Sequence, residues 1–160
     1  WMRRFVTFEF RPDDLKPLMA LNLIKLCVGA ESVEDQRMWG EMRLQEMRRS
    51  GVEACLSHTT RMMPKRAEEL LDGGSLYWVI KGKVQARQKL IEIRRVTDSE
   101  GINRCKLMLD SELIATQWQP KRAFQGWRYF NGDEVPDDLD GTQATIPPQL
   151  KAELAELGLL

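Results

Sequence analysis

Thr60–Arg95 reads TRMMPKRAEELLDGGSLYWVIKGKVQARQKLIEIRR, and the fold prediction starts from this stretch. The proline near its start suits the first turn of a helix, where its missing N–H leaves no bond unmade. Gly73 and Gly74 end that helix, because glycine readily adopts the left-handed conformation that other residues avoid. An apolar run then covers Ser75–Lys81, and Gly82 separates it from a basic run. The stretch therefore predicts a helix, a strand, a tight turn and a second strand, in that order.

The two predicted strands differ in their alternation. In the first, Leu76, Trp78 and Ile80 share one face, and the opposite face is also largely apolar, which indicates a strand covered on both sides. In the second, the apolar positions change from even to odd numbers near Lys89–Leu90. A change of parity within one strand predicts a β-bulge at that point.

Similar patterns extend along the rest of the chain. Ser32 and Asp35 resemble a capping box and predict a helix from there to about Arg49. Further strands are expected over 21–28, 52–60, 102–109 and 112–118, and Pro147–Pro148 begins a short terminal helix. The predicted fold class is α+β: a small mixed or barrel-like bent β-sheet of about six strands with two or three flanking helices.

A chain of 160 residues is most simply one domain that buries roughly 70% of its unfolded surface. We expect residues 1–18 to be an N-terminal extension, 19–140 to be a single α+β domain, and 141–160 to be an acidic loop with a C-terminal helix. Met19 stands directly before the first predicted strand and is the expected start of the native product. Deleting 1–18 should therefore leave the melting temperature nearly unchanged.

The net charge is zero, but the charges are unevenly spread. Residues 1–60 are neutral, 61–130 carry an excess of six positive charges, and 131–160 carry an excess of six negative charges. This pattern fits two faces of one molecule, or an acidic tail that shields a basic surface from wrong partners. The alternative is chance clustering of solvated side chains.

Three widely spaced cysteines, Cys27, Cys55 and Cys105, argue against a disulfide framework or a cysteine zinc site. They fit a reducing compartment, and we expect a cytoplasmic protein. No apolar run approaches the ~20 residues of a membrane span, so no membrane contact is expected. None of the common nucleotide-binding, metalloprotease, nucleophile-elbow or calcium-loop motifs occurs, so we expect no metal and no cofactor.

His58 is the only histidine, and Cys55 lies three positions before it. A nucleophile–base pair would need both side chains on one side of the chain. On a strand, odd and even positions point to opposite faces. We therefore predict a hydrogen-bonded structural histidine and no catalytic residues.

The candidate binding residues are basic, aromatic or amide side chains in and beyond the opening stretch. Lys83, Gln85 and Arg87 project from one face of a strand, and donors at this spacing suit a phosphate backbone. Basic and aromatic residues then alternate near 121–130, a pattern suited to stacking on bases and pairing with phosphates, although such aromatics also form cores. The predicted nucleic-acid-binding set is Arg61, Lys65, Arg66, Tyr77, Lys81, Lys83, Arg87, Gln88, Arg122, Trp127 and Arg128.

Within that set, three roles are expected. Phosphates would be held by Arg61, Lys65, Arg66, Lys81, Lys83 and Arg87. Tyr77 and Trp127 would offer stacking surfaces, and Gln88 or Arg128 would reach base edges. The partner predicted on these grounds is RNA.

The runs HTTRMMPKRAEELLDGGSLYWVIKG (58–82) and RAFQGWRY (122–129) carry a family resemblance. They resemble an uncharacterised bacterial family, domain of unknown function 1489, from about Leu21 to Asp138. That resemblance implies no established activity. A fainter resemblance, on the helix–glycine–strand order of 66–82, is to PUA-like folds, small β-barrels with a flanking helix that include RNA-binding modules. It implies a barrel-like fold but no particular function, because function depends on the residues of the site and not on the fold.

The first functional hypothesis is an RNA-binding domain that uses its basic face. The second is a binder of, or an enzyme acting on, a small phosphate-bearing metabolite in the same basic pocket. The third is a protein–protein adaptor that uses the C-terminal helix, whose leucines form one stripe.

Overall fold

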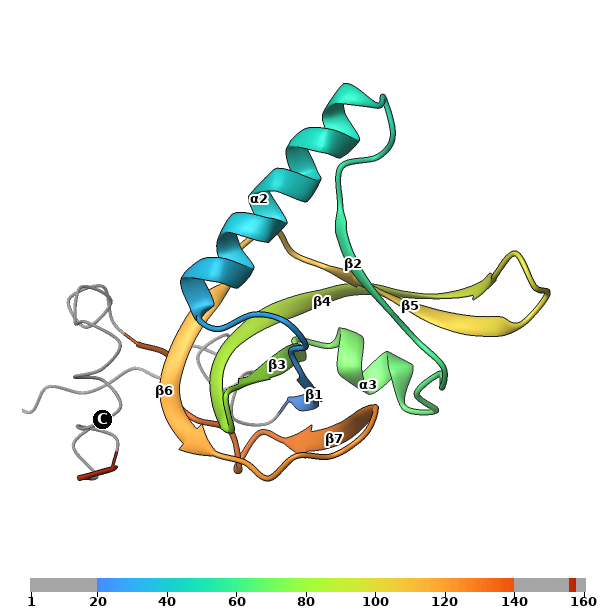
Figure 1. Ribbon diagram of the computed structural model, residues 1–160. Helices are drawn as coiled ribbons and strands as arrows, with labels where there is room; N and C mark the ends of the chain where they lie inside the picture. The colour runs from blue at the N-terminus through green and yellow to red at the C-terminus, as the bar shows by residue number, and fades with distance from the viewer. Residues whose placement is uncertain (1–19, 140–155, 158–160) are drawn as a thin grey trace, which may run out of the picture.

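The computed structural model describes residues 20–139 and 156–157 (Figure 1). The elements in this part are β1 (Leu21–Leu26), α2 (Val33–Arg49), β2 (Leu56–Thr60), α3 (Ala67–Leu71), β3 (Ser75–Ile80), β4 (Lys83–Thr97), β5 (Asn103–Leu109), β6 (Ile114–Pro120) and β7 (Trp127–Asn131). The predicted α+β class is confirmed, with seven strands and two helices in the described part. The N-terminal extension and nearly all of 141–160 lie outside the described residues.

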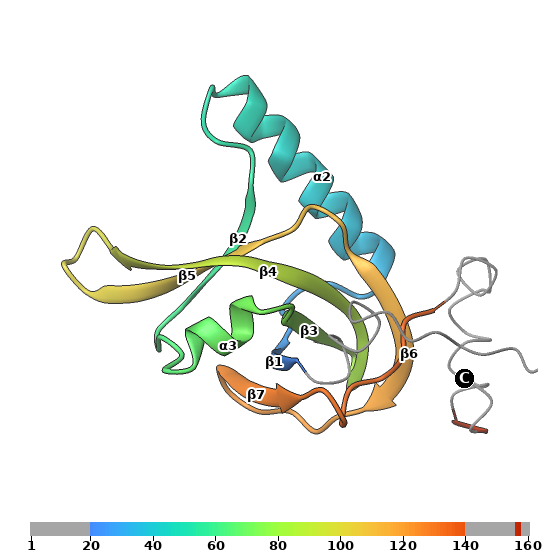
Figure 2. The ribbon, with the colours of Figure 1, turned by 180° about the vertical axis from the view of Figure 1, so that it is seen from behind.

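The seven strands form one strongly bent, open sheet in the order β2-β5-β4-β3-β1-β7. All its pairs are antiparallel except β1 with β3. The long strand β4 holds the sheet together, because its first half pairs with β3 and β6 and its second half with β5. Figure 2 shows β6 following the curve of β4 from behind. This bend brings β2 and β7, the two ends of the strand order, toward the same side of the molecule.

The core fills the inside of the bend. Leu23, Leu76, Ile80 and Leu107 are completely buried there, and Leu90 is 2% exposed. Burial of such side chains is the main source of stability, at roughly 1.5–3 kcal/mol each. The strand β3 is buried along its whole length, as its apolar composition predicts.

Helix α2 lies over one opening of the bent sheet and buries little of its own surface (Figure 1). It contributes Val33 and Leu44 to the core. Met38 and Met42, whose spacing in the sequence puts them on one face of the helix with Trp39, are 50% and 61% exposed. A helix over an opening touches the sheet along a narrow line only, so most of its surface meets water.

Local signals set the ends of α2. The Ser32 hydroxyl accepts a hydrogen bond from the Asp35 N–H at 3.1 Å, which confirms the predicted cap. The Asp35 carboxylate accepts from the N–H of Glu31 at 3.3 Å. In a capping box, the glutamate at this position accepts from the N–H of the cap residue itself. The shorter Asp35 instead accepts from the N–H of Glu31, the residue before the cap.

The β3–β4 connection is a two-residue turn with consecutive positive φ angles, 50° at Lys81 and 78° at Gly82. Such a turn matches the twist of an antiparallel hairpin. The register of β4 against β5 shifts between Leu90 and Glu92, which confirms the predicted bulge. The α3 helix is shorter than the predicted one, because it begins at Ala67 and not at Pro64.

Candidate nucleic-acid interface

Three side chains stand in register across neighbouring strands on the concave side of the sheet. Lys25 of β1 is paired with Trp78 of β3 on one side and with Trp127 of β7 on the other. Paired residues in a sheet point to the same face. A lysine is therefore flanked by two tryptophans, and this row forms the floor of two adjoining hollows.

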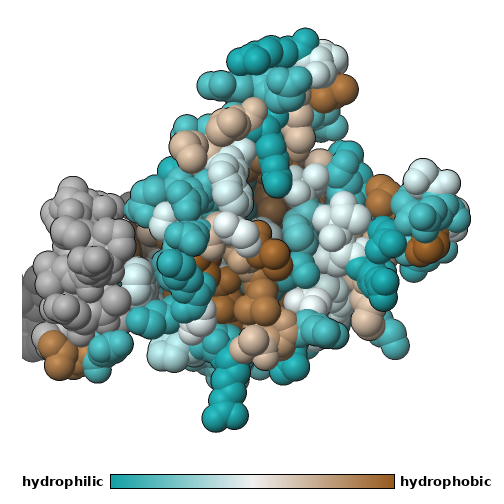
Figure 3. Space-filling view, viewed as in Figure 1, coloured by the Kyte–Doolittle hydropathy of each residue, from teal (hydrophilic) through white to brown (hydrophobic). Residues whose placement is uncertain are grey.

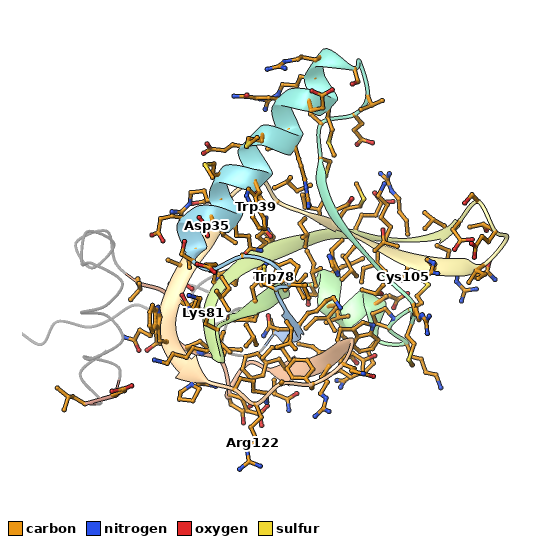
Figure 4. The ribbon with its side chains drawn as sticks, in the orientation of Figure 1. Asp35, Trp39, Trp78, Lys81, Cys105 and Arg122 are labelled. Atoms are coloured by element: carbon orange, nitrogen blue, oxygen red, sulfur yellow. The ribbon has the colours of Figure 1, made fainter. Side chains whose placement is uncertain are left out.

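The first hollow, which we call the α2 pocket, lies between α2 and the sheet and has a volume of about 380 Å³. Trp39, Gly40 and Arg43 of α2 line it from one side, and Lys25 and Trp78 from the other. Figure 4 shows Trp39 on the helix directly above Trp78. Figure 3 shows apolar residues gathered below α2 with hydrophilic residues around them. The pocket is thus a partly apolar space with a charged margin.

Hydrogen bonds fix the inner wall of the α2 pocket. The Trp78 indole N–H donates to the Gln88 side-chain oxygen at 2.9 Å, and the Gln88 amide donates to the Asp110 carbonyl at 3.1 Å. The His58 ring packs edge-on against Trp78, with 5.3 Å between ring centroids. Each side chain holds the next, so this wall is preorganised.

The α2 pocket is positively charged. Lys25 and Arg43 line it, and the described residues around it include no Asp or Glu. The pKa of His58 is lowered to about 4, first by burial and then by the nearby charges of Lys25 and Arg43. Burial also lowers the pKa of Lys25. Arg37 lines the pocket as well, and three cations with no counter-ion in the wall favour an anionic ligand.

Two polar atoms in the α2 pocket wall lack partners. They are Gln36 Oε1 and His58 Nε2, both buried and both without a hydrogen bond among the described residues. No other buried side-chain nitrogen or oxygen in the described part of the chain is unpaired. Buried polar groups are normally satisfied, so two unpaired atoms in one wall leave hydrogen-bonding capacity that a water or a ligand in the pocket can use.

The second hollow, the β7 groove, continues from the α2 pocket through the shared wall residues Lys25 and Thr59. Its volume is about 760 Å³. It runs between the end of β2 and the start of β7, which are joined where the Trp127 indole N–H donates to the Met62 carbonyl at 2.8 Å. The Tyr129 hydroxyl also accepts the Arg66 N–H at 3.2 Å.

Arginines dominate the charge of the β7 groove. Arg61, Arg104 and Arg128 line it, and its described lining contains no Asp or Glu. Arg104 is held by Asp98 at 2.8 Å, while Arg61 and Arg128 form no ion pair with any described residue. The guanidinium of Arg128 lies 5.0 Å from the centre of the Phe124 ring, which supports it by a cation–π contact.

The structure brings four of the predicted binding residues to this concave surface. Arg61, Trp127 and Arg128 line the β7 groove, and Gln88 lines the α2 pocket. Lys65 and Arg66 lie beside it, in a separate hollow near α3, where Arg66 pairs with Glu69.

Two predicted residues belong to other parts of the fold. Tyr77 is 3% exposed and packs edge-on against Phe130, which corrects its expected place on an exposed stacking surface. Burial raises its pKa to about 12. Arg87 donates to both carboxylate oxygens of Asp138 at 2.7 Å and to the Ser75 hydroxyl at 3.0 Å. Its charge is thus already paired inside the molecule.

The predicted row of donors on β4, formed by Lys83, Gln85 and Arg87, does not make one exposed surface, because each side chain has different neighbours. Gln85 is buried and donates to the Ile80 carbonyl at 2.8 Å, so it is no surface donor. The Lys83 ammonium lies 4.8 Å from the centre of the Trp118 ring. Lys81 pairs with Glu31 at 3.7 Å. Lys81 lies in the β3–β4 turn and lines neither the α2 pocket nor the β7 groove.

Arg122 lies apart from this surface as well. Figure 4 shows its side chain pointing away from the body of the molecule, below β7. It is exposed and lines neither the α2 pocket nor the β7 groove. Its place in the interface remains a prediction that the geometry does not support.

Residues 23–160 match the family described as "Protein of unknown function (DUF1489)". The chain belongs to this family. The resemblance noted from the sequence is thereby confirmed for most of the chain, whereas the PUA-like resemblance stays a prediction. No curated protein and no solved structure matches the chain. Among the described residues of this DUF1489 member, no helix is long and apolar enough to cross a membrane.

Sequence interpretation missed several wall residues of this DUF1489 protein, namely Gln36, Trp39, Arg43, Lys25 and the pocket role of Trp78. They come from β1, α2 and β3, and each fits an ordinary surface or core position in its own element. Lys25 carried one usable signal, because it is the only charged residue in a mostly apolar strand. Its two tryptophan neighbours are visible only once the strands are paired.

Proposed function

We propose that this protein is a nucleic-acid-binding domain and that its ligand is single-stranded RNA, bound along the β7 groove and the α2 pocket. The supporting observation is the continuous concave surface in which Lys25 stands between Trp78 and Trp127. Unpaired cations line this surface, and its described walls contain no carboxylate.

The chemistry of that surface matches the two halves of a nucleotide. Arg61 and Arg128 present guanidinium groups that pair with phosphate oxygens. Trp127 and Trp39 offer partly exposed ring faces beside them, on which unstacked bases can lie. Bases inside a duplex are already stacked and cannot enter such pockets, so a single strand is the fitting form of ligand.

The proposal is tested by the salt dependence of binding to a labelled single-stranded RNA. Contacts from Lys25, Arg43, Arg61 and Arg128 to four phosphates give a slope of about −2.8 in a plot of log affinity against log salt concentration. Affinity should therefore fall roughly 50-fold between 50 and 200 mM salt. Fluorescence anisotropy with single-stranded RNA and single-stranded DNA of the same sequence shows which of the two nucleic acids binds more tightly.

The double variant Arg61→Ala with Arg128→Ala should flatten that slope by about 1.4 and weaken binding at low salt. The matched control is Arg48→Ala, an exposed arginine in the last turn of α2 outside both hollows. No RNA binding at low salt, or equal losses in the double variant and the control, would contradict the proposal. Tighter binding of DNA would contradict RNA as the ligand.

A further inference from the structure

We propose that the α2 pocket is a binding site for one nucleotide, with its phosphate between Lys25 and Arg43 and its base inside, against Gln36 and the tryptophans. In the RNA complex this would be an unstacked nucleotide of the strand that occupies the β7 groove. That last step rests on the proposed function, whereas the pocket itself can be tested with a mononucleotide alone.

Size and enclosure support one small ligand. The volume of about 380 Å³ lies within the range of roughly 300–1,000 Å³ that small-molecule sites occupy. The pocket is walled by α2 on one side and by β1, β2 and β3 on the other. A second unit of the strand would have to lie outside it, in the adjoining β7 groove.

The charges place the anionic part of the ligand. Lys25 and Arg43 approach from opposite walls, and both act electrostatically on His58. The third cation of the wall, Arg37, is committed to the Leu113 carbonyl at 3.0 Å. Cys27 also lines the pocket, and burial raises its pKa, so its thiol supplies no negative charge. A phosphate is the group that offsets this charge.

The unpaired atoms place the base. Gln36 Oε1 is an acceptor and calls for an N–H donor, whereas Nε2 of the neutral His58 ring accepts or donates according to which ring nitrogen carries the proton. Nucleobases carry N–H donors on a flat aromatic ring. Trp39 is 38% exposed and lines the same space, so its ring can pack on such a base. A nucleotide combines a phosphate, a flat ring and N–H donors in one molecule.

His58 gives a direct readout, since it is the only histidine in the chain. Its ring signals in NMR spectra are to be followed during titration with adenosine 5′-monophosphate, with inorganic phosphate and with adenosine. We expect saturable shifts with the mononucleotide and at least about tenfold weaker binding of inorganic phosphate alone and of adenosine alone. The pKa of His58 should rise in the complex with the mononucleotide, because a bound anion offsets the neighbouring cations.

Arg43→Gln should weaken mononucleotide binding by about tenfold or more, the usual effect of losing one charge-assisted hydrogen bond. Arg48→Gln, on the same helix but outside the pocket, should bind like the unaltered protein. Gln36→Met should reduce the advantage of the mononucleotide over inorganic phosphate. Both altered arginines are exposed, so the fold is preserved in either variant.

Three results would overturn the inference: no saturable shift of the His58 signals, equal affinities of Arg43→Gln and Arg48→Gln, or equal binding of inorganic phosphate and the mononucleotide. If RNA still binds with the salt dependence given above, the proposed function stands without this pocket. If the mononucleotide binds and RNA does not, the pocket stands and the proposed function fails.

Discussion

At the scale of a residue, His58 is governed by its neighbours. Its ring makes a T-shaped contact with Trp78, and burial together with the charges of Lys25 and Arg43 lowers its pKa to about 4. The sequence predicted a hydrogen-bonded structural histidine. The Nε2 atom has no hydrogen-bond partner among the described residues, so at this nitrogen the prediction is wrong. The ring is neutral at pH 7, and its role in binding is a matter for the titration proposed above.

The low pKa of His58 predicts how stability changes with pH. The unfolded chain binds a proton on this residue below about pH 6.5, whereas the folded protein does so only near pH 4. Its contribution is therefore complete above pH 6.5 and is lost as the pH falls toward 4. We expect a loss of roughly 1–2 kcal/mol, reduced for solvent screening of a partly exposed ring.

Urea unfolding at several pH values, compared between the protein and His58→Phe, isolates this contribution from that of the carboxyl groups. Phenylalanine keeps the edge-on contact with Trp78 and does not titrate. The stability difference between the two proteins should change between pH 6.5 and 4. Parallel curves over that range would show that His58 titrates normally.

At the scale of elements, the junction of α3 and β3 depends on one glycine. The Gly74 N–H donates to the Leu70 carbonyl at 2.9 Å, and its carbonyl accepts from Leu90 at 3.0 Å. A Cβ at this position would lie 2.3 Å from the carbonyl oxygens of both Leu21 and Leu70. The absence of a side chain thus lets the end of α3 approach β1, which carries Lys25.

Gly74→Ala should destabilise the fold by about 3 kcal/mol or more, because backbone atoms on both sides must move. The matched control is Gly101→Ala in the β4–β5 turn, where φ is 80° and nothing lies within 4 Å of the added Cβ. That change should cost only the backbone strain of about 1–2 kcal/mol. Thermal unfolding followed by circular dichroism measures both, and equal losses would show that the close contacts at Gly74 relax easily.

At the scale of the whole molecule, Asp138, an acidic residue after β7, neutralises Arg87 of the basic middle stretch. Asp138 bridges to Thr116 of β6 and pairs with Arg87 of β4 at 2.7 Å. The Arg87 side chain is only 17% exposed. The hydrogen bond with Asp138 raises the pKa of Arg87, which stays charged and committed. The concave surface under α2 carries its cations without such partners in its described walls.

Asp138→Asn should destabilise the protein by about 1–3 kcal/mol, because it leaves a largely buried guanidinium without its counter-ion. Asp137→Asn is the control, since Asp137 is exposed and forms no ion pair with a described residue. Urea unfolding at pH 7 gives both values. RNA affinity should be nearly unchanged in Asp138→Asn, because Arg87 lies outside both hollows. A large gain in the RNA affinity of Asp138→Asn would show that Arg87, once released from Asp138, contacts the RNA.

The sequence by itself determined the features whose causes lie within a few positions. These include the Ser32 cap, the Gly82 turn, the bulge near Leu90 and the buried strand at 75–80. Backbone conformation, side-chain alternation and capping act over one or two turns of chain, so their signals survive without tertiary context. The confirmed α+β class follows from the order of these elements.

Only the tertiary structure decided which charges share a surface. Strand pairing sets Lys25 between Trp78 and Trp127, and the packing of α2 adds Arg43 opposite. Folding also removed Arg87 from the set by pairing it with an aspartate far along the chain. Whether a cation is available to a ligand depends on the partners that folding brings to it, and local sequence patterns do not contain that information.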